Sequence, residues 1–162
     1  MKPMKNVFAM LALTALSTVC VFAQTTPKVL ETPKFDAELA QKLGADKYGM
    51  KKYVIAVLKT APNAPTFSKE ESDKIFAGHM GNMNRLAEEG KLVVAGPFSD
   101  PKKFFRGLFI LNVTTIEDAE KLVNTDPVVK SGMMVADLVP WWGSAALMDA
   151  NRVHKLIAKE NP

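Results

Sequence analysis

The sequence has one cysteine, two histidines and three arginines among 162 residues, and each shortage excludes a class of chemistry or partner. Neither histidine has a carboxylate cluster at ligand spacing around it, so we expect no metal site. There is no glycine-rich phosphate loop or nucleophile motif, so we expect no cofactor and neither hydride nor phosphoryl transfer. The net charge is +4 without a dense basic cluster, so nucleic acid is not an expected partner.

Beyond its amino terminus, the chain has no run near the roughly 18 apolar residues of a membrane span. Residues 1–23 instead show the parts of a secretory signal peptide. A positive start precedes an almost unbroken apolar run from Val7 to Val19, and permissive residues allow a cut ahead of Gln24. We expect a secreted or periplasmic protein with no cysteine after cleavage. Lipid attachment at Cys20 and an uncleaved anchor are the alternatives.

The composition, 48% hydrophobic and 23% charged, is that of an ordinary globular protein. Residues 24–51 begin as a linker rich in Pro and Thr and include a helix-compatible stretch, so we interpret them as an N-terminal arm. Residues 52–142 carry the strongest periodicity and are the predicted domain. Residues 143–162 are a predicted C-terminal helical extension with an apolar stripe.

Periodicity within residues 52–142 predicts the order β-α-β-β-α-β. The expected elements are strand Tyr53–Lys59, helix Ser68–Glu89, strand Leu92–Phe98, strand Phe104–Val113, helix Ile116–Asn124 and strand Met133–Trp142. This order is typical of the ferredoxin-like α+β fold, in which both helices cover one face of a four-stranded antiparallel sheet. We expect the other face to have no cover within the chain. A second subunit would then cover it, which predicts a homodimer.

Three motifs stand in the order and spacing of a known family. They are a helical histidine followed by a Gly and a strand ending in Gly-Pro (His79, Gly90, Gly96-Pro97), an Asp-Pro followed by Gly (Asp126-Pro127, Gly132), and Pro140-Trp141. Together they resemble the YciI-like (YCII-related) family over about Lys52 to Trp142. The resemblance implies a dimeric α+β barrel with a His–Asp pair in a small cleft. It also implies small cyclic or phenolic substrates, and a dehydrochlorinase of chlorinated hydroxyquinols is among the related proteins.

His79 and Asp126 are the candidate catalytic residues. A neutral imidazole on an apolar helix face, oriented by a carboxylate, can exchange a proton with a substrate near neutral pH without a cofactor. Asp126 would accept the other N–H of the ring and fix its tautomer. The alternatives are that His79 is a packed core residue and that Asp126, which precedes Pro127, is only a helix cap.

Arg106, Asp137 and Trp141 are candidate substrate-binding residues. Arg106 and Asp137 are single charges within apolar strands, where an unpaired buried charge is costly. They would line the cleft and hold an anionic group, or else face solvent or form pairs. Trp141 would form a wall of an aromatic pocket, or serve as a core or interface anchor.

Two functions remain open from the sequence. In the first, the protein binds a small cyclic or aromatic molecule, and His79 and Asp126 catalyse a cofactor-free proton transfer, elimination or isomerisation. In the second, the same dimeric fold is a non-catalytic ligand-binding or interaction module. The sequence does not decide between them, because a fold does not fix a function.

Overall fold

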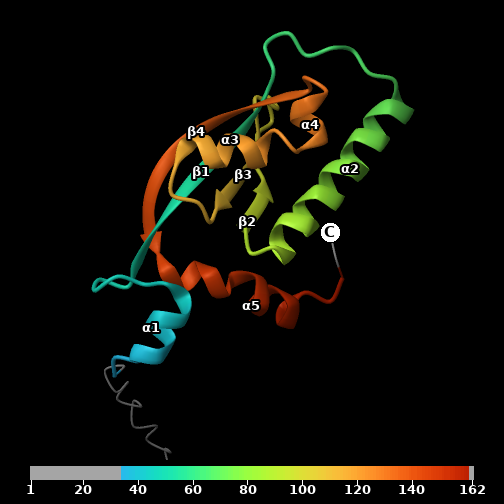
Figure 1. Ribbon diagram of the computed structural model, residues 1–162. Coiled ribbons are helices and arrows are strands. Elements are labelled where there is room, and N and C mark those ends of the chain that lie inside the picture. The colour runs from blue at the N-terminus through green and yellow to red at the C-terminus, as the bar shows by residue number, and fades with distance from the viewer. Residues whose placement is uncertain (1–33, 161–162) are drawn as a thin grey trace, which may run out of the picture. The chain divides into compact units, whose positions relative to one another are not determined.

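The computed structural model describes residues 34–160, and Figure 1 shows the order of their elements. The elements are α1 (Ala37–Leu43), β1 (Met50–Thr60), α2 (Lys69–Glu88), β2 (Leu92–Pro97), β3 (Phe105–Leu111), α3 (Ile116–Val123), α4 (Pro127–Lys130), β4 (Met134–Ser144), the short 3-10 helix η1 (Ala145–Asp149) and α5 (Ala150–Ile157). The predicted signal peptide, residues 1–23, lies outside the described residues, as does the arm up to residue 33.

The four strands form one antiparallel sheet in the order β2-β3-β1-β4. In the centre of the sheet, Val54 of β1 lies opposite Leu111 of β3 on one side and Pro140 of β4 on the other. Consecutive strands β2 and β3 form a hairpin, whereas β1 and β4, the first and last, are neighbours. The predicted ferredoxin-like β-α-β-β-α-β fold is confirmed.

Local capping explains where the helices begin and end. Ser68 and Glu71 form a capping box at the start of α2, each side chain accepting from the backbone N–H of the other. After α2, Gly90 adopts a φ of +67°, a left-handed conformation that favours glycine. Asp126 caps α4, and Pro127 occupies its first turn. These boundaries agree with the predicted helices to within one or two residues.

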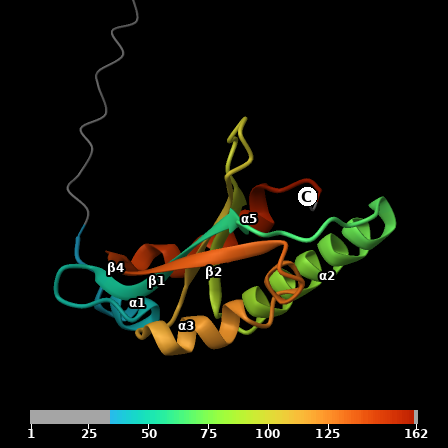
Figure 2. The same ribbon diagram turned by 90° about the horizontal axis from the view of Figure 1, so that it is seen from above.

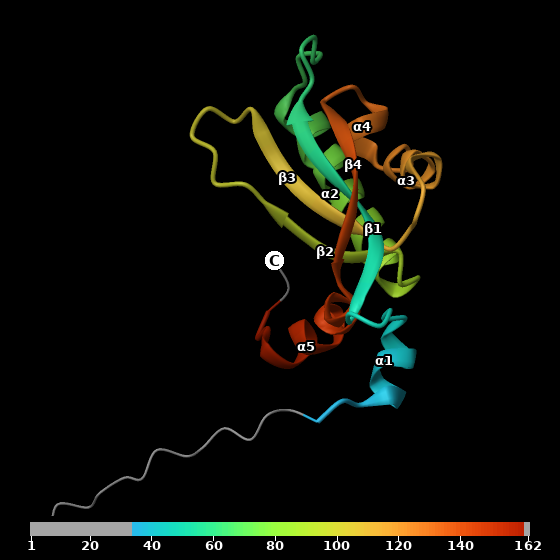
Figure 3. The same ribbon diagram turned by 90° about the vertical axis from the view of Figure 1, so that its left-hand side faces the viewer.

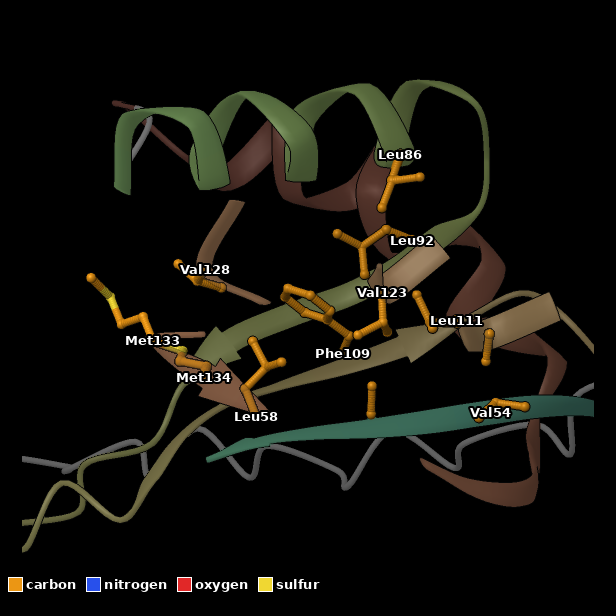
Figure 4. Packing of buried hydrophobic residues seen from close by; sticks show 12 residues of the cluster. Val54, Leu58, Leu86, Leu92, Phe109, Leu111, Val123, Val128, Met133 and Met134 are labelled. Atoms are coloured by element: carbon orange, nitrogen blue, oxygen red, sulfur yellow. The ribbon is translucent and has the colours of Figure 1, made fainter. Parts of the chain in front are cut away.

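The main core lies between one face of the sheet and the helices. Figure 4 shows its side chains between α2 and the strands, with Phe109 near the middle. The buried members are Val54, Ala56, Leu58, Leu86, Leu92, Phe109, Leu111, Ala119, Val123, Val128, Met133 and Met134. Alternate residues of β1 and β3 supply this face, as the period of two in a strand requires.

The expectation that the second face of the sheet is uncovered within the chain was wrong in part. We expected it to lack any cover from its own chain, but Leu147 and Met148 of η1 pack against Tyr53 and Val93, which are both buried. Figure 2 shows α5 across the sheet from α2 and α3. The side chain of Asn151 donates to the carbonyl oxygen of Leu92 over 2.8 Å, which ties α5 to β2.

This cover reaches only part of the face. Figure 3 shows α5 near one end of the strands and the β2–β3 hairpin loop extending from the other. Away from η1, the second face presents apolar side chains to solvent, among them Val135, Val139 and Trp141 of β4. The apolar stripe of the extension is only partly used, since Leu156 and Ile157 are exposed.

The described part of the N-terminal arm is joined to the end of β4. Trp142 donates its indole N–H to Asp46 over 3.0 Å, and Asp46 also accepts from the backbone of Tyr48 and Met50. Strands β1 and β4 extend together to Met50 and Ser144. None of the helices in the described part of the chain is long and apolar enough to cross a membrane.

Candidate active site

Two elements on the helix-covered side of the sheet bring His79 and Asp126 together. His79 lies in the middle of α2, and Asp126 is the N-cap of α4, 47 residues later in the chain. α3 ends at Val123, and the chain then turns through Thr125 into the cap of α4, beside α2 (Figure 1). The contact is therefore produced by helix packing rather than by closeness in sequence.

The carboxylate of Asp126 meets the imidazole of His79 with both oxygens. Nδ1 of His79 lies 2.9 Å from Oδ1 and 2.8 Å from Oδ2. Asp126 is 0% exposed, and the side chain of His79 is 13% exposed. Oδ1 of Asp126 also accepts from the backbone N–H of Val128 over 3.1 Å. The two roles that the sequence suggested for Asp126, helix cap and histidine partner, are thus both present in the geometry.

This contact assigns the hydrogen of the neutral imidazole. A carboxylate accepts and does not donate, so Nδ1 carries the hydrogen and Nε2 keeps its lone pair. Nε2 makes no hydrogen bond within the described residues and is not among their fully buried unpaired atoms, so part of its surface is accessible. The pair therefore offers one orientated, accessible base.

Aromatic rings border the imidazole on two sides. The ring of Phe109, from β3, is stacked on His79 with centroids 5.9 Å apart and planes 21° apart. Phe76, one turn earlier on α2, meets His79 edge-on at 6.3 Å. Phe76 is partly exposed, so the apolar border of the site reaches the surface.

Asn82 and Thr125 are neighbours of the pair that the sequence analysis did not identify. Thr125 directly precedes Asp126, and its hydroxyl lies 3.0 Å from Oδ1 of Asn82, which follows His79 by one helical turn. Arg85 donates to Oδ1 of Asn82 over 2.8 Å. Phe109 was not expected beside the histidine either. Adjacency to Asp126 was the only sequence signal for Thr125.

The sheet separates two of the three candidate substrate-binding residues from the His79–Asp126 pair. Asp137 and Trp141 lie on the second face, where Asp137 forms an ion pair with Lys59 at 2.5 Å. The ring of Trp141 packs against Tyr53 with centroids 5.9 Å apart. The ion pair fits the alternative that Asp137 is paired rather than ligand-binding. A substrate-binding role for Asp137 and Trp141 stays a prediction.

Arg106, the third of these candidates, lines a hollow of about 390 Å³ at the β2–β3 hairpin together with Phe98 and Lys103. Asp100 organises this hairpin, and hydrogen bonds from the backbone N–H groups of Phe105, Lys102 and Phe104 lower the pKa of its carboxyl. The hollow is not lined by His79 or Asp126. Within residues 34–160, no group of three or more His, Cys, Asp or Glu side chains is placed to hold a metal ion.

Comparison with known proteins places the chain among relatives. It is 32% identical over 65 residues to the uncharacterised protein YjpA of Bacillus subtilis (strain 168), a match covering 40% of this chain and 73% of that protein. A solved structure, the 5-chloro-2-hydroxyhydroquinone dehydrochlorinase of Burkholderia phenoliruptrix AC1100 in complex with 2,5-dihydroxybenzoquinone, is 19% identical. The structural match covers 55% of this chain and 92% of the chain of that enzyme, with a TM-score of 0.42.

A family model also matches, and it confirms the resemblance that the motifs indicated. The model describes the YCII-related domain and matches residues 52–142. This stretch includes His79, Asp126 and all four strands of the sheet apart from the outer ends of β1 and β4. Because the match covers more than half of the 162 residues, the chain belongs to the YCII-related domain family.

Proposed function

We propose that the protein binds a small cyclic or aromatic molecule and that His79 and Asp126 catalyse a proton transfer, elimination or isomerisation on it without a cofactor. One observation carries the proposal. A fully buried carboxylate contacts Nδ1 of an imidazole whose Nε2 has no hydrogen-bond partner within the described residues and is not fully buried. This is the arrangement of a general base oriented by a second group, which needs no further cofactor to move a proton.

The two ring nitrogens of His79 have different roles in the proposed reaction, because Nδ1 contacts Asp126 and Nε2 is left for the substrate. Nε2 of His79 takes a proton from a hydroxyl or an activated C–H group of the substrate. The resulting imidazolium stays next to the carboxylate of Asp126, which stabilises its charge. In an elimination from a chlorinated hydroquinone-type substrate, one hydroxyl proton first moves to the carbon that carries chlorine, which gives a keto tautomer. Nε2 then takes the proton of the second hydroxyl while chloride leaves with the electron pair of the C–Cl bond, and a quinone remains. In an isomerisation, Nε2 returns the proton to a different atom.

The surroundings of the imidazole support a cyclic ligand. Phe109 lies against one side of the imidazole and Phe76 extends the apolar border to the surface. Aromatic side chains at such a border give a flat ligand apolar contact area at a small entropy cost.

His79→Ala, with His154→Ala as the matched control, tests the proposal. His154 lies exposed on α5, far along the chain from the pair. Purified variants would be screened for halide release from chlorinated hydroquinones and for binding of phenols and quinones. We expect His79→Ala to lose turnover by about 100-fold or more, while His154→Ala behaves as wild type. Because His79→Ala leaves the buried Asp126 carboxylate with only the N–H of Val128, it also lowers the free energy of unfolding, so turnover is compared at a temperature where every variant is folded.

The non-catalytic alternative has its own support. The side chain of His79 is only 13% exposed, and its ring is stacked on Phe109 like that of a core residue. This alternative predicts that His79→Ala, measured where the variant is folded, leaves both ligand binding and any turnover unchanged. That outcome would reject the catalytic proposal. Binding by the wild type without turnover of any tested substrate class would favour a ligand-binding module.

We also propose a homodimer formed through the second face of the sheet. The part of that face beyond η1 is apolar and exposed, with Val139 half exposed and Val135 and Trp141 beside it on β4. Exposed apolar patches of this kind mark interaction sites. A second copy of the same face supplies a matching surface through twofold symmetry.

Export is a further proposal, and it rests on the pattern of residues 1–23 in the sequence. The protein would then work as a secreted or periplasmic chain that begins at Gln24. N-terminal sequencing of protein recovered from outside the cytoplasm tests this. A chain that retains Met1 would reject cleavage ahead of Gln24, and absence of the protein outside the cytoplasm would reject export.

A further inference from the structure

Three residues of α2 meet three consecutive residues of the corner between α3 and α4, in opposite chain order. The contacts are Gly78 with Pro127, His79 with Asp126, and Asn82 with Thr125. The His79–Asp126 contact is therefore bracketed on both sides. We call the two flanking contacts, Gly78 with Pro127 and Asn82 with Thr125, the first and second brackets. Each bracket contains a residue with an unfavourable feature that its contact with the α3–α4 corner offsets.

Gly78 belongs to the first bracket. A Cβ added at this position would lie 2.9 Å from Cγ and 3.4 Å from Cβ of Pro127. The pyrrolidine ring of a proline can change only its pucker and has no rotatable side chain, so a larger residue at position 78 crowds α4 and favours a wider separation of the two helices. Glycine in the interior of a helix is unfavourable relative to alanine. Its presence here permits the close contact beside Asp126.

Asn82 belongs to the second bracket. Its Oδ1 lies 3.0 Å from the hydroxyl of Thr125 and accepts from Nη2 of Arg85 over 2.8 Å. Arg85 can only donate, so it fixes which end of the amide points toward Thr125. The other end, Nδ2, is buried and has no hydrogen-bond partner within the described residues. The hydroxyl of Thr125 also donates to the carbonyl oxygen of Leu122 over 2.6 Å, and Nη2 of Arg85 donates to this hydroxyl over 3.2 Å. Arg85 therefore joins Asn82 to Thr125 in one hydrogen-bonded cluster, whose contacts offset the unpaired donor.

The bracketed contact is sensitive to small displacements. Nδ1 of His79 lies 2.8 to 2.9 Å from both carboxylate oxygens, within the normal range of a hydrogen bond. Moving α2 a few tenths of an ångström away from the corner takes these distances toward the end of that range. Hydrogen bonds weaken steeply there, and the preference for hydrogen on Nδ1 weakens with them.

We propose that Gly78 and Asn82 are positioning residues that hold His79 against Asp126 and thereby fix the tautomer of the imidazole. The inference deepens the proposed function and rests on it for its effect on turnover. The effect on the tautomer is independent of any substrate. Neither residue touches the ligand in this proposal, and both act through His79.

Gly78→Ala, with Gly81→Ala as the matched control, tests the first bracket. Both glycines are interior to α2, but a Cβ at position 81 meets nothing within 4 Å. The ¹⁵N spectrum of the two histidine rings, assigned with His154→Ala, reports the tautomer directly. We expect the wild type and Gly81→Ala to show hydrogen on Nδ1 of neutral His79, and Gly78→Ala to show a mixture of the two tautomers. A folded Gly78→Ala with the wild-type ring spectrum would overturn the role of Gly78.

Asn82→Ala tests the second bracket and keeps the proposal testable if Gly78→Ala does not fold. Asn84→Ala is its control, because Asn84 is exposed on the same helix. We expect a tautomer mixture in Asn82→Ala and in Thr125→Val, and the wild-type spectrum in Asn84→Ala. Thr125→Ser restores the hydroxyl and should restore the spectrum, which a purely structural role for the methyl group of Thr125 would not predict.

Failure of this inference and failure of the proposed function give different results. If His79→Ala keeps full turnover while Gly78→Ala still changes the ring spectrum, the positioning inference holds and the catalytic role of His79 is wrong. If His79→Ala abolishes turnover but the ring spectra of Gly78→Ala and Asn82→Ala match the wild type, the positioning inference is wrong. If the positioning inference and the catalytic role of His79 are both correct, we expect kcat of Gly78→Ala to fall at least tenfold with KM nearly unchanged.

Discussion

At the scale of single residues, Asp126 is the side chain on which the most contacts converge. Among the described residues it is the one charged side chain that is fully buried. Its carboxylate both caps α4 and holds Nδ1 of His79. A buried carboxylate is tolerated only when such partners compensate for lost hydration. Replacing it therefore affects folding and chemistry together unless the replacement keeps one of the two contacts.

Asp126→Asn and Asp126→Ala separate these contributions. Alanine removes the cap and leaves Nδ1 of His79 unpaired, so we expect it to lower the free energy of unfolding by about 3–5 kcal/mol. Asparagine keeps an oxygen for the backbone N–H of Val128, so we expect a loss of only about 1–2 kcal/mol. Urea denaturation at neutral pH measures both. Equal losses in the two variants would contradict the capping role.

The sequence identified His79 and Asp126 but not their neighbours, for a physical reason. Spacing in a helix and an Asp-Pro pair are local patterns, so they could be read along the chain. Asn82 stands at an ordinary helix position, and an asparagine there is indistinguishable from a solvated one. Its contact with Thr125 spans 43 residues and exists only once α2 has packed against the α3–α4 corner.

At the scale of elements, the start of α2 responds to pH. The backbone N–H of Ser68 donates to the carboxylate of Glu71, and this hydrogen bond, with that of the Ser68 side chain, lowers the pKa of Glu71 from 4.5. A carboxyl whose pKa is lowered on folding stabilises the fold above its unfolded pKa. That stabilisation is lost as pH falls through the lowered value.

We therefore expect the first turn of α2 to loosen only once the pH falls below 4.5, the ordinary value for Glu71. The amide proton shift of Ser68 in NMR spectra should show this as a single step in the wild type. Glu71→Gln keeps an acceptor oxygen but cannot titrate, so the step should disappear. Glu70→Gln, one position earlier, should leave it in place. A step centred at or above 4.5 would contradict the capping box as its cause.

Elements were predictable where a local rule fixes them. Capping residues, Gly90 and the alternation of the strands predicted the helices and strands of residues 52–142. The surface against which the C-terminal extension packs was not predictable. The apolar stripe of the extension indicates that something is covered, but a stripe does not say which surface. Only the packing of Leu147 and Met148 on the second face shows that this chain covers part of its own sheet.

At the scale of the whole molecule, the remaining apolar area on the second face leads to the dimer prediction. Val139→Lys places a charge in the middle of the exposed patch, where it would be buried by a second copy. We expect the wild type to be dimeric and this variant monomeric in sedimentation experiments. Phe35→Lys, an equally drastic change at an exposed position outside the sheet, should stay dimeric. A monomeric wild type would reject the dimer.

The opposite chain directions of α2 and the α3–α4 corner also constrain where the chain can change in length. An extra residue inserted between Gly78 and Asn82, or between Thr125 and Pro127, would change the spacing of the contacts on one segment and not on the other. Each segment would still form its own helix or turn, so secondary structure alone would not show the damage. We infer that these two short stretches are less tolerant of insertion or deletion than of most single substitutions.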